Sequence, residues 1–186
     1  MPTLRTVAVL VGSLRRQSFN RKVALTMVEL AAGTLTLELV EIGGLPLYNQ
    51  DDEADPPAAW VAFRAAIRRV DAVLFVTPEY NRSVPGALKN AIDVGSRPYG
   101  KSVFAKKPAA IVSVSPGAIG AFGANHHLRQ SLVFLDMPVM QQPEAYIGGA
   151  DKLFDANDRL TNEATRVFLK EFLDGFAQWI ERNIAP

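Results

Sequence analysis

The stretch Val7-Ala-Val-Leu-Val-Gly-Ser-Leu-Arg-Arg-Gln-Ser-Phe-Asn20 (VAVLVGSLRRQSFN) contains an apolar run, a polar loop and the start of a helical pattern. Residues Val7–Val11 are all apolar, as in a strand that is buried on both faces of a parallel sheet. Gly12 and Ser13 end this run, and the helical pattern starts near Phe19. The stretch therefore predicts the first strand and the first helix of an α/β domain.

Four cations crowd the start of this predicted helix: Arg15, Arg16, Arg21 and Lys22. The N-terminus of a helix carries a partial positive charge, which normally favours Asp and Glu in the first turn. Because cations stand there instead, the pattern indicates a missing anion.

Short apolar runs alternate with helical patterns along the rest of the chain. The predicted strands are Val7–Val11, Leu35–Ile42, Ala72–Val76, Ala109–Val114 and Val139–Ile147. The predicted helices are Asn20–Ala32, Ala58–Arg69, Gly86–Ser96, Asn125–Phe134 and Thr161–Asn183. The alternation predicts a single α/β domain over residues 1–186, with helices on both faces of a doubly wound, five-stranded parallel sheet in the order 2-1-3-4-5.

Three further patterns refine this prediction. The run Leu35–Ile42 alternates apolar and polar residues, as an edge strand with one wetter face would. The last helix carries an aromatic stripe, which predicts a face packed on the sheet. The stripe consists of Phe168, Phe172, Phe176 and Trp179. The polar segment Asp51–Pro57 is predicted to be a surface loop.

The composition excludes several classes of function. The net charge of +1 gives no basic stripe for nucleic acid, and the absence of cysteine removes disulfides, thiol catalysis and iron–sulfur ligation. No acidic cluster surrounds His126 and His127, so no metal site is predicted. No apolar run approaches the roughly 18 residues of a membrane span, and Val7–Val11 is too short for a signal peptide. We therefore expect no membrane partner and a cytoplasmic location.

Three predicted strands end alike, in VLVGS, LFVTP and VSVSP. In a parallel sheet of the predicted order, the loops after strands one and three flank the switch in strand order, where ligands bind. The first loop suits a phosphate, since Ser13, Ser18, the Asn20 amide and backbone N–H groups can donate, and Arg15 adds charge. It is neither a Walker A loop nor a dinucleotide fingerprint. The alternative is that Ser18 only caps the helix and the arginines face solvent.

The other two loops suit a flat ring. Thr77–Gly86 contains two prolines that fix the backbone of a polar, aromatic segment, and Ser115–Gly123 contains three glycines, which let a ring approach closely. Each is also compatible with an ordinary surface connection. Together the three loops predict FMN, which joins one terminal phosphate to a planar isoalloxazine.

At three places the chain resembles the NADPH-dependent FMN reductases of flavodoxin-like fold, in particular their bacterial quinone and chromate reductase branch. The segments that carry the resemblance are GSLRRQSFN (12–20), PEYNRSVPGALKNAIDVGSR (78–97) and SPGAIGAFGANHHLRQSLVFLDM (115–137). It implies non-covalent FMN with NAD(P)H as co-substrate. The implied phosphate contacts are Ser13, Arg15, Ser18, Phe19 and Asn20, and the implied ring contacts are Pro78, Glu79, Tyr80, Asn81, Ser115 and Gly117.

The resemblance further implies an enzyme that passes hydride from NAD(P)H to flavin N5 and then electrons to quinones or other acceptors such as chromate. No side chain need act as an acid or base, so no catalytic residue is named, although Arg82 and Arg97 are candidates for steering anionic acceptors. A homodimer or homotetramer is implied as well. Lys89 and Asp93 could contribute to its contacts, since a Lys that precedes Asp by four residues pairs poorly within a helix, and Arg129 and Glu144 could join them. The alternative is that Lys89 and Asp93 form a solvated pair.

Three other functions are possible for such a domain. A flavodoxin-type electron carrier would normally present an acidic surface, whereas this chain has a net charge of +1. A phosphoacceptor signalling domain would need acidic residues where the chain has Gly12-Ser13 and Thr77-Pro78. A flavin-free binding module would show no flavin absorbance even after FMN is added.

Overall fold

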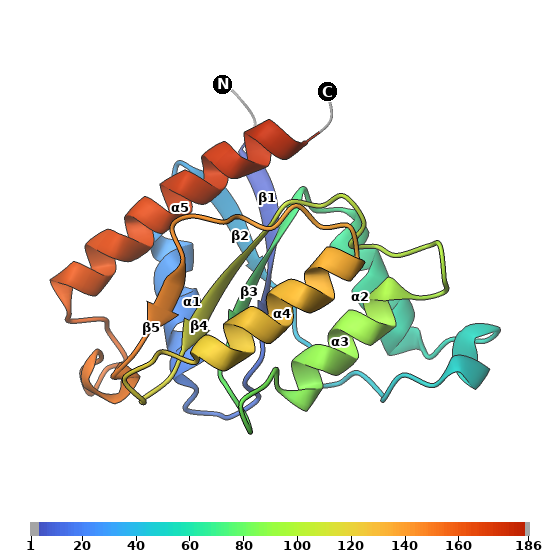
Figure 1. Cartoon of the computed structure of the whole chain (residues 1–186), viewed down its shortest axis with the longest axis horizontal. Coiled ribbons are helices and arrows are strands. Elements are labelled where there is room, and N and C mark those ends of the chain that lie inside the picture. Colours follow the sequence, from blue (N-terminus) through green and yellow to red (C-terminus); the bar gives the residue numbers. More distant parts are fainter. Residues whose placement is uncertain (1–3, 185–186) are drawn as a thin grey trace.

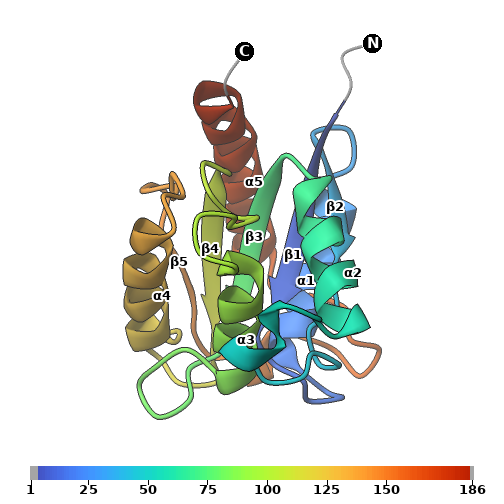
Figure 2. The ribbon, with the colours of Figure 1, turned by 90° about the vertical axis from the view of Figure 1, so that its right-hand side faces the viewer.

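The computed structural model describes residues 4–184 as five parallel strands that form one sheet, with helices on both of its faces (Figures 1 and 2). The strands are β1 (Arg5–Val11), β2 (Leu35–Leu39), β3 (Ala72–Thr77), β4 (Ala109–Val114) and β5 (Ala145–Ile147). Their order in the sheet is β2-β1-β3-β4-β5. The predicted fold class and strand order are confirmed.

The helices divide between the two faces of the sheet. They are α1 (Phe19–Leu30), α2 (Ala58–Arg68), α3 (Gly86–Ser96), α4 (Phe122–Phe134) and α5 (Glu163–Asn183), with 3₁₀ turns η1 (Gln50–Glu53) and η2 (Ala150–Lys152). Val7 and Val9 of β1 pack with α1 and α5, whereas Ala8 and Leu10 pack with α2, α3 and α4. Because successive strand residues point to opposite faces, one apolar run supplies both cores.

The aromatic stripe of α5 packs on the sheet, as predicted. Phe172 and Phe176 are fully buried, and Phe168 and Trp179 pack against the same core. The Trp179 indole N–H donates to the Pro138 carbonyl at 2.8 Å. The stripe therefore has a structural role.

Two predicted strands are shorter in the structure. β2 ends at Leu39, and only one further ladder bond, from the Val40 N–H to the Val9 carbonyl, follows it. β5 starts at Ala145, and Val139 makes only an isolated bridge to Ala109. Proline lacks the N–H that a ladder needs, and the intervening sequence Pro-Val-Met-Gln-Gln-Pro (138–143) has one at each end.

Two connections also differ from the prediction. α4 begins at Phe122, three residues before the predicted start, so the last two residues of the predicted third loop are helical. The predicted surface loop Asp51–Pro57 contains part of η1, and the Tyr48 hydroxyl donates to the Glu53 carboxylate at 2.6 Å. The contact at η1 is local, whereas the first turn of α4 is contacted by Glu79, which lies 45 residues away in the sequence.

The contact of Gly95 with Phe104 yields a test of the core. A Cβ added at Gly95 would lie 2.4 Å from the ring of Phe104, which is fully buried. We expect Gly95→Ala to lower the free energy of unfolding by about 1–3 kcal/mol, since overpacking outweighs the gain in helix propensity. Urea unfolding measures the change. Gly44→Ala is the control, because a Cβ there meets no atom within 4 Å, and an equal effect of both substitutions would contradict the packing argument.

Candidate functional site

The first loop leaves the sheet through a tight contact between β1 and β3. The Gly12 N–H donates to the Val76 carbonyl at 2.9 Å, and a Cβ at Gly12 would lie 3.2 Å from atoms of Thr77, Pro78 and Leu88. The absence of a side chain therefore lets the first loop lie directly against the start of the second loop.

The protein itself compensates part of the positive charge at the start of α1. Arg21 pairs with Glu41 at 2.7 Å, and Lys22 pairs with Asp158 at 2.6 Å. Within residues 4–184, Arg15 and Arg16 have no carboxylate within ion-pair distance. Carboxylates from distant segments thus compensate the charges of Arg21 and Lys22. The charges of Arg15 and Arg16 remain available to a ligand.

Ser18 and Arg15 both have partners within the first loop. The Ser18 hydroxyl accepts from the Arg21 N–H at 3.2 Å, which makes Ser18 the N-cap of α1. The Arg15 guanidinium donates to the Gln17 carbonyl at 2.7 Å and lies 5.2 Å from the centre of the Phe19 ring. The helix-capping alternative therefore holds for Ser18, which is buried.

The three predicted loops meet around one cavity of about 360 Å³. Eight of the eleven predicted contact residues line it: Ser13, Arg15, Phe19, Asn20, Pro78, Glu79, Tyr80 and Ser115. The other three do not. Ser18 is buried beneath the loop, Asn81 lies in the turn that follows Tyr80, and Gly117 donates its N–H to the Ser115 hydroxyl at 3.0 Å.

Asn20 lines this cavity and carries a buried acceptor that has no partner in the described part of the chain. Its side chain is 4% exposed, and its Nδ2 donates to the Val114 carbonyl at 3.4 Å. Its Oδ1 is buried and has no partner among residues 4–184. A buried acceptor without a donor costs free energy, so the cavity suits a ligand that brings a hydroxyl or N–H to this point.

The second loop is held by a tight turn and by a carboxylate. Tyr80 and Ser83 exchange two backbone hydrogen bonds of 3.1 and 3.0 Å, and Asn81 and Arg82 between them have φ angles of 50° and 64°. Glu79 Oε2 accepts from the Ala124 N–H at 3.1 Å, so the second loop caps α4. This carboxylate links the second loop to the helix that follows the third.

The third loop is fixed by a buried polar network that the sequence reasoning missed. The Ser113 hydroxyl donates to the Gly120 carbonyl at 2.7 Å, and Asn125 Nδ2 lies 3.3 Å from the same hydroxyl. Arg129 Nε donates in turn to Asn125 Oδ1 at 3.1 Å. A serine within the apolar strand β4 was the available signal, but its partners lie on segments that only the fold brings together.

Comparison with known proteins identifies the family. The sequence pattern of the family described as NADPH-dependent FMN reductase matches residues 5–152. The chain belongs to this family. A quinone reductase from Pseudomonas putida is 66% identical over 186 residues, which is the full length of both chains. A 2-hydroxy-1,4-benzoquinone reductase from a Burkholderia species is 48% identical over 174 residues, or 94% of this chain and 95% of that protein.

Among solved structures, the flavoenzyme NAD(P)H:(acceptor) oxidoreductase from Paracoccus denitrificans is similar over 97% of this chain and 99% of its own, with a TM-score of 0.91 and 45% identity. The predicted family, the flavodoxin-like fold and the prediction of an oxidoreductase are therefore confirmed.

Two arginines that the sequence suggested for acceptor steering differ in their surroundings. Arg97 is held in an ion pair with Glu53 at 2.9 Å and lies 5.6 Å from the centre of the Tyr48 ring. Hydrogen bonds from Tyr48 and Arg97 lower the pKa of the Glu53 carboxyl. Arg82 is largely exposed beside Glu79, at 3.6 Å. The Arg82 side chain is 78% exposed, against 26% for Arg97, so of the two Arg82 is the more accessible to an anion.

The residues predicted for a subunit network pair within the chain instead. Lys89 Nζ donates to both carboxylate oxygens of Asp93, at 2.7 and 2.8 Å, although the order of the two charges along α3 is the less favourable one. Arg129 lies 3.9 Å from Glu144. Within the single chain, Lys89 and Asp93 thus form a solvated pair, and the subunit network stays a prediction.

Tyr146 lies at the rear of the third loop, where its main chain contacts Gly120. Its hydroxyl is 3.1 Å from His126 Nε2. Burial and the nearby Glu144 raise the pKa of Tyr146 to about 12, so this phenol is neutral at physiological pH.

Residues 4–184 contain no group of three metal-ligating side chains and no helix of the length and hydropathy that a membrane span requires.

The contact of Glu79 with α4 yields a test of the loop arrangement. We expect Glu79→Ala to lower the free energy of unfolding by about 1–2 kcal/mol, since α4 loses a side-chain acceptor at the first turn and a favourable charge near its N-terminus. Glu79→Gln retains an acceptor and is expected to lose less.

Urea unfolding of both variants measures these changes, with Glu171→Ala as the control because Glu171 is exposed on α5. Equal stability of Glu79→Ala and the control would show that this carboxylate does not hold α4.

Proposed function

We propose that this enzyme binds FMN in the three-loop cavity and uses NAD(P)H to reduce quinones. The observation that carries the proposal is the set of side chains that line the cavity. The first loop contributes Ser13 and Arg15, which suit a phosphate, and the third loop contributes Ser115 and Pro116, which carry no charge. FMN joins a phosphate to a flat ring, so it can use both loops.

The residues present fit this group. Ser13, Arg15 and the N–H groups at the start of α1 would hold the phosphate, because the first N–H groups of a helix lack intrahelical partners. Ser18, which is buried, would support this site as the N-cap of α1. The free Asn20 Oδ1 accepts hydrogen bonds, so we assign Asn20 to a ribityl hydroxyl rather than to a phosphate oxygen. Pro78, Glu79, Tyr80 and Asn81 would lie along the ribityl and the ring, and Ser115 and Gly117 would approach its far side.

Bound FMN would supply the redox chemistry, by taking hydride from NAD(P)H and passing electrons to the acceptor. The chain's own task is then to position the ring and leave room for a second substrate. The fixed turn at Tyr80–Ser83, the Glu79–Ala124 hydrogen bond and the Ser113–Gly120 hydrogen bond make the walls rigid. No cavity side chain is required to transfer a proton.

The relatives support quinones as the acceptor class. Two of the similar proteins are named quinone reductase and 2-hydroxy-1,4-benzoquinone reductase. Chromate remains a proposal that rests on the broad reactivity of reduced flavin. The alternative of an electron carrier without enzymatic activity is disfavoured, because the relatives carry enzyme names over the full length of the chain.

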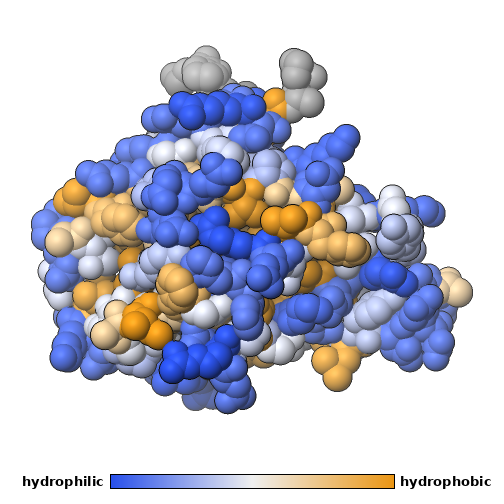
Figure 3. All heavy atoms as spheres, viewed as in Figure 1, coloured by the Kyte–Doolittle hydropathy of each residue, from blue (hydrophilic) through white to orange (hydrophobic). Residues whose placement is uncertain are grey.

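We propose the oligomer from the surface of α4. Phe122, Val133 and Phe134 of this helix are 50%, 73% and 80% exposed. Figure 3 shows apolar residues between polar ones on the face where α4 lies. Exposed aromatic side chains of this kind are enriched at contacts between subunits. A homodimer or homotetramer with α3 and α4 at its contacts stays a prediction. The cytoplasmic location stays a prediction as well.

The proposed function is tested by the visible spectrum of the purified protein, after addition of FMN if it is colourless. We expect flavin bands that bleach when NADPH is added without oxygen and return when a quinone is added. Bands that persist with NADPH would favour a carrier that another protein reduces. The absence of bound flavin would contradict the proposal.

Arg15 provides a more specific prediction. Arg15→Ala is expected to weaken FMN binding roughly tenfold, since one charge-assisted contact at an exposed site is lost. Flavin fluorescence during an FMN titration measures the dissociation constant. Arg166→Ala, an exposed arginine of α5, is the matched control. If both variants bind FMN like the original protein, Arg15 does not contact the phosphate.

A further inference from the structure

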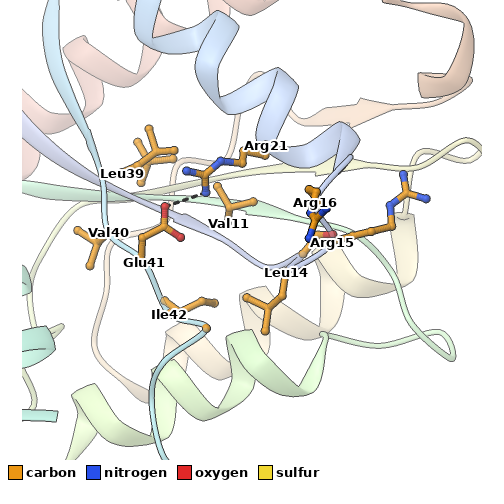
Figure 4. Close-up of a pocket in the computed structure, with 12 residues that line it drawn as sticks. Val11, Leu14, Arg15, Arg16, Arg21, Leu39, Val40, Glu41 and Ile42 are labelled. Carbon is orange, nitrogen blue, oxygen red and sulfur yellow. Dashed lines mark ion pairs between the residues drawn. The ribbon is translucent and has the colours of Figure 1, made fainter. Parts of the chain in front are cut away.

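A second cavity lies on the other side of the first loop. It has a volume of about 430 Å³, within the range of small-molecule sites. Its walls come from the end of β1, the first loop, the start of α1 and the segment that follows β2 (Figure 4). Ser13 and Arg15 line both this cavity and the three-loop cavity, so the two are neighbours across the first loop.

The charge of this second cavity favours an anion. Its lining contains three arginines and one glutamate, Glu41, which leaves two positive charges in excess. Figure 4 shows the Glu41 carboxylate turned toward Arg21, and the two form an ion pair of 2.7 Å. The Arg15 side chain points away from this pair. Arg16 is therefore the cation that this cavity can offer to a ligand.

The floor of the second cavity favours a flat, apolar body on the same ligand. Six apolar residues line it: Val9, Val11, Leu14, Leu39, Val40 and Ile42. Leu14 packs over Gly43, where a Cβ would lie only 3.1 Å from its Cδ2. An inorganic anion would leave this surface without a partner. A ligand that joins a phosphate to an aromatic base through a sugar would use both the apolar floor and the arginines.

We propose that this second cavity binds the adenosine 2′-phosphate end of NADPH; the inference rests on the proposed use of NAD(P)H. In α/β nucleotide sites, an acidic residue at the second strand typically bonds the ribose hydroxyls of NAD, whereas a nearby arginine accommodates the 2′-phosphate of NADP. Glu41 stands two residues after β2, but Arg21 offsets its charge. Arg16 then determines the preference for the phosphorylated co-substrate.

The test is calorimetric titration of the FMN-loaded protein with adenosine 2′,5′-bisphosphate and, separately, with 5′-AMP. We expect the bisphosphate to bind at least about tenfold more tightly, because only it brings the 2′-phosphate to Arg16. Arg16→Ala should weaken the bisphosphate roughly tenfold and leave 5′-AMP unchanged, since one charge-assisted contact is lost. Arg166→Ala is the control and should match the original protein.

Steady-state kinetics give a second readout. The ratio of kcat/KM for NADPH to kcat/KM for NADH should fall about tenfold in Arg16→Ala and stay constant in Arg166→Ala. Equal affinity for the two nucleotides, or an unchanged ratio in Arg16→Ala, would overturn the inference.

Failure of this inference is distinguishable from failure of the proposed function. A protein that binds FMN and oxidises NADPH, but does not prefer the bisphosphate, refutes only the second cavity's role. A protein that binds no FMN refutes the proposed function. The bisphosphate titration is then run without FMN, and preferential binding that depends on Arg16 still supports the second cavity as a site for the nucleotide.

Discussion

The parallel pairing of β3 with its two neighbours is the constraint on which the site depends. Val76 of β3 is the register partner of Val11 in β1, and Thr77 is the partner of Ser113 in β4. The three strands therefore end at the same edge of the sheet, and their loops meet around one cavity. The Gly12 N–H, which donates to the Val76 carbonyl, carries this alignment one residue past the end of β1.

The distribution of charge follows from the same arrangement. Four cations at one helix start are unfavourable for an isolated helix, but the fold brings Glu41 to Arg21 and Asp158 to Lys22. Arg15 and Arg16 lie in the loop ahead of the helix, where Arg15 lines both cavities and Arg16 lines the second. The positive charge that remains is therefore concentrated where two anionic groups, the phosphate of FMN and the 2′-phosphate of NADPH, are proposed to bind.

Much of the fold could be predicted because its signals are local. Apolar runs such as Val7–Val11 and Ala109–Val114 identify buried strands, and the alternation with helices identifies the topology. The bounds of three elements could not be predicted: the end of β2, the start of β5 and the start of α4. β5 is shortened by the prolines that precede it, and the first turn of α4 contacts Glu79, which is distant in the sequence. Lys89 and Asp93 illustrate the same limit, because the order of charges along a helix changes a pair's energy by only a few tenths of a kcal/mol and does not decide whether the pair forms.

The candidate site was predictable in its outline and less so in its details. Small and hydroxyl residues after three apolar runs indicated the three loops, and eight of the eleven residues line the cavity. The cap at α4 by Glu79 and the support of the third loop by Ser113 depend on segments that are far apart in the sequence. The direction of the Asn20 amide also depends on its bond to Val114. Each of these details is set by tertiary structure.

The most direct measurement compares the affinities of FMN and riboflavin, which differ only in the phosphate, by fluorescence titration of the flavin-free protein. If the first loop and the start of α1 hold the phosphate, FMN should bind at least about 100-fold more tightly, because two or more charge-assisted hydrogen bonds are at stake. Equal affinities would contradict the central claim that the cationic first loop is a phosphate site.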